Sequence, residues 1–268
     1  ALNGPGTINA SGVFHVSPSN PNVFGGSGSL LVHGTMNWSA FRITLAGGIT
    51  VAPDGTLLLT NQNGGKDLST TINNEGTTVW TAGDVGGTAT TTVNLLAFGT
   101  LSQSGGTITA GALSIRDGVG GSSGPFGVAL NQTNTVSLLD ALSSKGLAIT
   151  TGATNLTVSL ATAAAGQAVT ITTGARLDLS GTIGGTPTTA VALNAPGALS
   201  QSGGVITAGS LTIRDTAAGT TGPAGVALGR NNAVASLDAT STAGLIYTNG
   251  ATDLTVARAT SGVGQTVT

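Results

Sequence analysis

The sequence predicts an all-β solenoid, a fold in which the chain winds through stacked coils of about 21 residues. Three observations carry this prediction. Gly-Thr pairs recur at a 21-residue period in the first hundred positions, and a 98-residue repeat fills the rest of the chain. In addition, Thr, Val, Ser and Gly dominate the composition, and these residues form helices poorly, whereas the β-branched ones suit a pleated sheet.

The shorter period places a strand in each coil. Gly34-Thr35, Gly55-Thr56 and Gly76-Thr77 follow one another at 21-residue intervals, and Gly12 precedes the first of these glycines by 22. The second and fourth residues after each Gly form two mostly apolar columns, which are Phe14, Met36, Leu57, Thr78 and Val16, Trp38, Leu59, Trp80. Alternation of this kind is typical of a strand with one buried face. We therefore expect strands to stack at about 4.8 Å along the axis of the coils.

The longer period repeats without a gap. Residues 199–268 reproduce residues 101–170, with roughly 42 of the 70 aligned pairs identical. We expect each 98-residue repeat to hold four or five coils. The predicted organisation is 21-residue coils over 1–100, a first copy over 101–198 and an incomplete second copy over 199–268, all in one continuous rod. The second copy stops partway through the 98-residue repeat, so we expect the natural protein to continue.

A tandem array of β-sandwich domains is the alternative fold. Sandwich domains of about 100 residues would account for the longer period. They account neither for the 21-residue spacing nor for an aromatic content of only 3%. The sequence therefore favours the solenoid.

The charge content excludes several classes of function. The 268 residues include 8 Lys and Arg against 10 Asp and Glu, so that 7% are charged, whereas an ordinary domain has about 25%. No basic cluster exists to bind nucleic acid. The absence of cysteine excludes disulfides and thiolate metal sites. No apolar run approaches the length of about 18 residues that a membrane-spanning helix needs.

Several segments resemble a known family. Residues 26–38 and 73–80 look like the degenerate coils of large secreted bacterial β-helix proteins, and residues 197–209 are similar to repeats of filamentous-haemagglutinin-like adhesins of Gram-negative bacteria. This resemblance implies a right-handed parallel β-helix, export across the outer membrane, and a role as a surface fibre or adhesin. It brings no catalytic residues with it.

The residues that could carry catalysis or metal binding are scattered. Glycoside hydrolysis needs two carboxylates close together, but no two acids are adjacent; they are Asp54, Asp67, Glu75, Asp84, Asp117, Asp140, Asp178, Asp215, Asp238 and Asp253. The segment closest to a calcium-binding repeat is Gly25–Leu30, which has Leu at the ligand position. We therefore expect no catalytic, cofactor-binding or metal-binding residues.

Four remaining features receive structural interpretations. His15 and His33 are expected at the surface, His15 on an outward position. The recurring pairs Arg116-Asp117 and Arg214-Asp215 are expected at strand ends, where Asp opens a turn. Trp38 and Trp80 are expected to pack in the core; the alternative is a sugar-stacking platform. Thr-rich runs at 107–109, 150–151 and 170–172 suggest ice binding as an alternative function. They recur irregularly, however, and are also typical of soluble strands.

These observations predict a non-enzymatic protein without cofactors. The expected function is a structural or adhesive part of a secreted bacterial surface fibre, in which the solenoid acts as a stiff rod. The alternative is a carbohydrate-binding β-helix module of a larger surface protein. The expected partners are further copies associating end to end and a host or matrix glycan, with no nucleic acid and no membrane-spanning segment. The expected location is the cell surface or the extracellular space.

Overall fold

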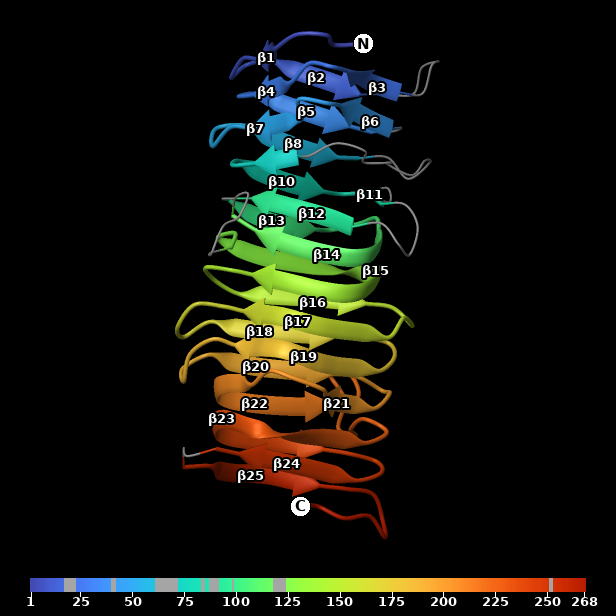
Figure 1. Ribbon diagram of the computed structural model, residues 1–268, viewed down its shortest axis with the longest axis vertical. Helices are drawn as coiled ribbons and strands as arrows, with labels where there is room; N and C mark the ends of the chain where they lie inside the picture. Colours follow the sequence, from blue (N-terminus) through green and yellow to red (C-terminus); the bar gives the residue numbers. More distant parts are fainter. Residues whose placement is uncertain are drawn as a thin grey trace. The chain divides into compact units, whose positions relative to one another are not determined.

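The structure, a computed structural model, describes residues 1–16, 23–39, 42–60, 72–82, 85–86, 92–97, 99–117, 124–250 and 253–268. Throughout these ranges the regular elements are β-strands, and the strands pair in parallel as coils of a β-solenoid about 21 residues apart (Figure 1). The predicted all-β solenoid is therefore confirmed. The chain forms two compact units, residues 1–135 and 136–268. The predicted division at residues 100 and 198 follows the sequence repeat and stays a prediction.

The first unit contains two series of stacked parallel strands and a small extra sheet. One series is β1 (Gly6–Ile8), β4 (Leu30–Val32), β7 (Ile49–Val51), β9 (Ile72–Asn74), β12 (Thr92–Ala97) and β14 (Ile108–Arg116), with β11 (Val85–Gly86) also paired to β14. The other is β2 (Val13–Val16), β5 (Thr35–Trp38), β8 (Thr56–Leu59), β10 (Thr77–Trp80), β13 (Thr100–Gln103) and the start of β15 (Gly127–Leu142). The extra sheet pairs β3 (Val23–Gly26) with β6 (Arg42–Leu45).

The two columns predicted from the 21-residue period lie in register. Pairing of β2, β5, β8 and β10 aligns Val16, Trp38, Leu59 and Trp80 across four successive coils, and the other column aligns in the same way. The side chains of both columns point inward, and those of Trp38 and Trp80 are buried. Five of the eight alternate positions carry polar side chains, and none is Lys, Arg, Asp or Glu; the five are His15, Thr35, Asn37, Thr56 and Thr77.

Close approach between coils explains why glycine recurs at this period. A Cβ atom added to Gly34, Gly55 or Gly76 would overlap a backbone carbonyl oxygen of the preceding coil. No side chain fits there, so each coil corner requires glycine for packing. The Gly-Thr pair therefore recurs every 21 residues because each coil has the same tightly packed corner.

The second unit also stacks its strands in two series. The first is β16 (Leu147–Thr151), β18 (Ala168–Thr172), β20 (Ala190–Asn194), β22 (Ile206–Arg214), the second half of β23 (Val226–Thr240) and β25 (Thr255–Thr260). The other is the end of β15, β17 (Leu156–Thr162), β19 (Leu177–Gly184), β21 (Leu199–Gln201), the start of β23 and β24 (Leu245–Asn249).

Strands that correspond through the 98-residue repeat lie in opposite series of this unit. β24 is the counterpart of β16, yet β16 belongs to the series that ends on β25. β25 is the counterpart of β17, yet β17 belongs to the series that ends on β24. From β16 the stack rises by four coils through β18, β20 and β22 to the second half of β23. The chain then crosses to the other series to form β24, which pairs with the start of β23, so each repeat corresponds to about four and a half coils. This value lies within the predicted range of four or five.

Candidate functional site

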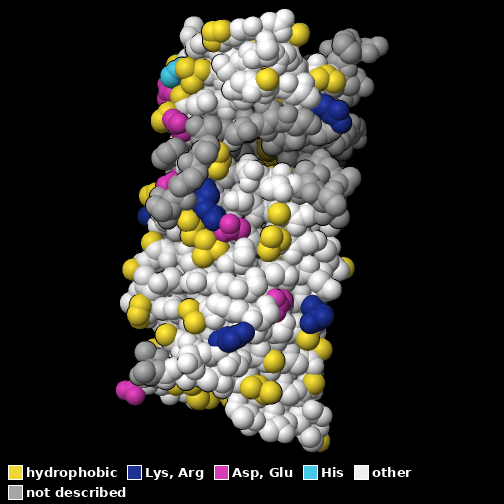
Figure 2. Space-filling view, viewed as in Figure 1, with side chains coloured by type: hydrophobic (Ala, Val, Ile, Leu, Met, Phe, Trp, Pro, Cys, Tyr) yellow, Lys and Arg dark blue, Asp and Glu magenta, His cyan; other side chains and the backbone are white. Residues whose placement is uncertain are grey.

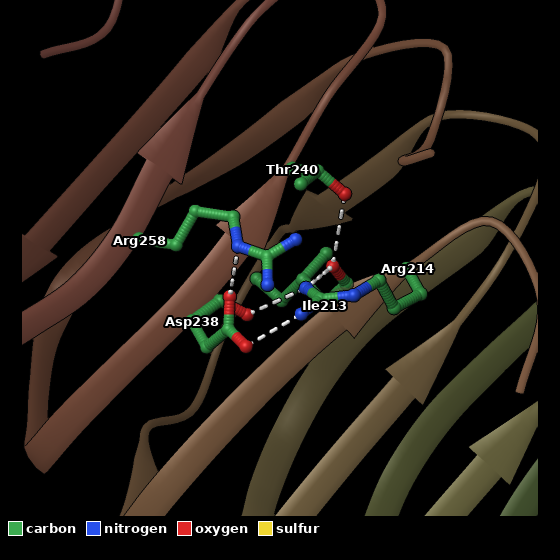
Figure 3. Close-up of polar contacts among 5 residues, drawn as sticks. All are labelled: Ile213, Arg214, Asp238, Thr240 and Arg258. Atoms are coloured by element: carbon green, nitrogen blue, oxygen red, sulfur yellow. Dashed lines mark hydrogen bonds and ion pairs between the residues drawn. The ribbon is translucent and has the colours of Figure 1, made fainter. Parts of the chain in front are cut away.

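A ladder of three charged side chains, Arg214, Asp238 and Arg258, lies in the second unit. It runs across the strands β22, β23 and β25, whose register places Asp238 opposite Arg258 (Figure 3). Arg214 Nη2 donates a hydrogen bond of 2.5 Å to Asp238 Oδ2, and its Nη1 donates to the carbonyl oxygens of Asp238 at 3.0 Å and Ile213 at 2.7 Å. Arg258 Nε lies 3.1 Å from Asp238 Oδ1.

The ladder alternates in charge and becomes more exposed toward β25. The side chain of Arg214 is 10% exposed, that of Asp238 31% and that of Arg258 46%. The guanidinium of Arg214 is thus largely buried and depends on one carboxylate and two backbone oxygens for compensation. A single carboxylate between two arginines has no second acid to act with it. The arrangement ties three successive coils in register and leaves one net positive charge at its outer end.

The two residues of the recurring pair Arg214-Asp215 make separate contacts. Asp215 opens a loop, as predicted: its Oδ1 accepts a hydrogen bond of 2.8 Å from Thr216 N, and its Oδ2 accepts one from the Thr221 hydroxyl. Arg214 instead binds Asp238, which the sequence reasoning did not assign to it. A signal was present, because Asp140 follows Arg116 at the same separation in the first copy as Asp238 follows Arg214 in the second.

A second polar arrangement is buried at a bend of the chain. Asn232 Oδ1 accepts hydrogen bonds of 2.9 Å from both Gln201 Nε2 and Ile206 N. In the first unit Asn134 receives the equivalent bonds from Gln103 and from Ile108 N, at 3.0 and 2.8 Å. Both asparagines are buried. They satisfy a backbone N–H where the strand bends, a role that the sequence reasoning missed although the Gln and Asn recur 31 residues apart in both copies.

A third arrangement lies on the outside of the second unit. Asp178 accepts hydrogen bonds from Ser200 Oγ at 2.9 Å and from Ser202 Oγ at 2.6 Å, two residues of the following coil. Arg230 Nη2 donates to the Ser202 carbonyl at 2.7 Å. We call Asp178, Ser200, Ser202 and Arg230 the outer polar row. Figure 2 shows that, on the face it displays, charged side chains are few and scattered.

The two histidines lie at the surface. His15 is exposed, as its outward position predicted. His33 Nδ1 lies 2.8 Å from Asp54 Oδ1, and both side chains are substantially exposed. His33 and Asp54 are 21 residues apart in the sequence, which is the coil period, so their contact also joins neighbouring coils.

The two tryptophans are core residues. Trp38 and Trp80 are each 1% exposed, which confirms the prediction of core packing and removes them as a sugar-stacking platform. Between them lies an apolar cavity of about 30 Å³, lined also by Leu59, Thr78 and Leu96. A volume of this size holds one or two small molecules the size of water, but its apolar lining offers them few partners.

The structure also places the calcium-like run and two of the Thr-rich runs. Leu30, at the ligand position of the calcium-like run, is buried. Thr170 lies between Ala148 and Ala192 in the adjacent coils. Thr172 lies between Thr150 and Asn194, so stacked threonines extend over only two coils there. Two of the scattered acids, Asp67 and Asp84, lie outside the described residues.

In the described ranges, no three His, Asp or Glu residues are grouped so that they could hold a metal ion. Across the same ranges, no helix has the length and apolar character to cross a membrane.

Comparisons of the chain with protein-family models, with curated proteins and with solved structures gave no significant match. The functional inference therefore depends on the contacts of the chain itself. In the ladder, in the outer polar row and in the His33–Asp54 pair, polar side chains bridge successive coils. These contacts add side-chain links between successive coils to the backbone hydrogen bonds.

Proposed function

We propose that this protein is a structural or adhesive component of a secreted bacterial surface fibre, and that its solenoid acts as a stiff rod. The observation that carries the proposal is the parallel register of successive coils, joined by backbone hydrogen bonds along the stack. Bending such a stack would break many hydrogen bonds at once, because each coil is bonded to both of its neighbours.

The contacts of the acidic residues support a structural rather than a catalytic role. Asp54, Asp178, Asp215 and Asp238 each contact a side chain of a neighbouring coil or of their own loop. Glycoside hydrolysis would require two carboxylates about 5–9 Å apart on either side of a bound sugar. Carboxylates already engaged in holding coils together are poorly placed to act as acid or base.

The proposed setting follows from the resemblance to filamentous-haemagglutinin-like adhesins. Such a protein would be exported across the outer membrane, would wind as a right-handed helix and would stay at the cell surface or in the extracellular matrix. Low charge suits this role, because like charges stacked at coil spacing would repel each other. The proposed partners are other fibre subunits, associating end to end, and glycans of the host or matrix.

A carbohydrate-binding module is the second candidate, and the outer polar row favours it. Asp178, the two serine hydroxyls and Arg230 offer a carboxylate, hydroxyls and a guanidinium on an outer surface of the second unit. These groups can exchange hydrogen bonds with sugar hydroxyls. None of the four residues of the row is aromatic, so the row lacks the ring on which sugars commonly stack.

Glycan-array binding distinguishes the two candidates. The chain would be compared with the double variant Asp178→Ala, Arg230→Ala and with Asn231→Ala as a matched surface control. The structural role predicts no glycan signal that the double variant removes. A signal lost only in the double variant would favour the carbohydrate-binding module. Cleavage of any polysaccharide on the array would contradict both candidates.

A further inference from the structure

Asn249, the last residue of β24, fastens that strand to the bend of β23 (Figure 1). Its side chain binds both backbone polar groups of Val234: Asn249 Oδ1 accepts a hydrogen bond from Val234 N, and Nδ2 donates one to Val234 O, each at 3.1 Å. Oδ1 also accepts a bond of 3.0 Å from the Tyr247 hydroxyl. Val234 is 0% exposed, so its backbone groups depend on partners within the protein. We call the two bonds to Val234 the Asn249 clamp.

The residue that follows the clamp is Gly250, and the dipeptide Asn-Gly favours deamidation. In this reaction the backbone nitrogen of the second residue attacks Cγ of the asparagine. The new N–C bond closes a succinimide ring, the bond from Cγ to the side-chain nitrogen breaks, and ammonia leaves. Water then opens the ring to aspartate or isoaspartate. Glycine favours ring closure because it has no side chain to obstruct the approach.

The fold holds both reacting groups in hydrogen bonds. Gly250 N donates to the carbonyl oxygen of Asn232 at 2.6 Å, and the carboxamide of Asn249 is fixed to Val234 through its nitrogen and its oxygen. Ring closure requires Gly250 N to lose its proton and Cγ of Asn249 to turn toward it, so all three bonds must open first. Asn232 is itself buried, and its amide donates to Thr248 O at 3.1 Å. The reaction therefore requires local unfolding of the bend.

The first copy lacks the clamp. Thr151 is the counterpart of Asn249 through the 98-residue repeat, and its buried hydroxyl has no hydrogen-bond partner among the described residues. Threonine has no carboxamide, so it can neither form the pair of bonds nor deamidate. The clamp and the reactive dipeptide thus occur together, at one of two corresponding positions.

We propose that Asn249 is a deamidation site whose reaction the fold suppresses, and that its conversion to aspartate or isoaspartate releases β24 from the bend of β23. Loss of Nδ2 removes the donor to Val234 O and places a carboxylate oxygen against that carbonyl oxygen. Isoaspartate also adds a carbon to the backbone, which shifts the pairing of residue 249 with Asn232. The change is one-way because ammonia leaves. The proposal is independent of the fibre role, since it depends only on contacts within the second unit.

The first measurement compares reaction rates in the complete chain. Folded protein and protein unfolded in denaturant are kept at the same mildly alkaline pH, and peptide mapping by mass spectrometry follows deamidation of each asparagine. Asn3 is the matched reference, because it also precedes a glycine and is exposed. Asn249 is expected to react roughly tenfold or more slowly in the folded than in the unfolded protein, whereas the rate at Asn3 changes much less. Equal rates for Asn249 in the two states would overturn the proposal.

The second measurement uses variants that imitate the product. Asn249→Asp carries the carboxylate of the product, and Asn231→Asp adds the same charge at an exposed position of β23 as the matched control. Asn249→Thr supplies the counterpart residue of the first copy without a charge. Hydrogen exchange at Val234 N and over 245–250 is expected to quicken roughly tenfold in Asn249→Asp, less in Asn249→Thr, and not in Asn231→Asp. The same exchange in Asn249→Asp as in Asn231→Asp would show that the clamp does not hold β24, against the proposal.

Discussion

Arg214 and Asp238 are 24 residues apart in the sequence and are joined by a hydrogen bond of 2.5 Å, because one winding of the chain brings β23 onto β22. Arg214 is buried, and its other donors are held by backbone oxygens of Ile213 and Asp238. The 24-residue spacing of the two charges in the sequence therefore corresponds to one coil of the solenoid. The contact also makes the largely buried guanidinium of Arg214 dependent on the charge of Asp238.

Replacing Asp238 by Asn should destabilise the protein by about 1–3 kcal/mol, because the buried guanidinium of Arg214 loses its ionic partner. Arg258→Gln should cost less, under about 1 kcal/mol, since Arg258 is half-exposed and its pairing is screened by water. Chemical denaturation of the two variants checks the order. A larger loss for Arg258→Gln would contradict the assignment of Arg214 as the buried partner.

Replacing Asn232 by Ala should cost about 2–3 kcal/mol, because Ile206 N and the Gln201 amide would lose their acceptor in a buried bend. The adjacent and exposed Asn231 is the matched control, and Asn231→Ala should change the free energy of unfolding by less than about 0.5 kcal/mol. Urea unfolding curves provide the comparison. Similar losses in both variants would show that the buried network does not hold the bend.

Replacing Gly55 by Ala should destabilise the first unit by about 2–3 kcal/mol, because the new methyl group would overlap the Val32 carbonyl oxygen. A methyl group added at Gly229 would meet no atom within 4 Å, so Gly229→Ala serves as the control and should be nearly neutral. Thermal unfolding of both variants tests this difference. A tolerated Gly55→Ala would mean that the corners are looser than the close approach implies.

Alkaline pH should destabilise the protein through Tyr247. Burial raises the pKa of the Tyr247 phenol, whose hydroxyl donates to Asn249 Oδ1 at 3.0 Å. The unfolded chain ionises near pH 10 while the folded chain keeps its proton, so stability falls as the pH rises above about 10. Tyr247 is the only tyrosine, and its tyrosinate absorbance reports this group alone. Ionisation near pH 10 in the folded protein, or an unchanged alkaline profile in Tyr247→Phe, would contradict the prediction.

The sequence predicted the coils because period and packing coincide in them. Gly34, Gly55 and Gly76 mark corners that no other residue can fill, and the Trp38–Leu59–Trp80 column follows from strict alternation. The sequence did not predict that corresponding strands of the two repeats lie in opposite series. The 98-residue period gives the length of the repeat, but it does not show at which residues each coil begins and ends. The partner of Arg214 was missed because the Arg-Asp pair was considered only as the end of a strand, whereas the contact with Asp238 reaches across to the next coil.

Electron microscopy of the native material, with an antibody against residues 136–268 marking the protein, tests the central claim most directly. The fibre role predicts thin, unbranched fibres that extend from the cell surface or lie in the matrix and carry the label along their length. Labelled material that is only dispersed and soluble, with no fibres under conditions where the protein is abundant, would contradict a structural role.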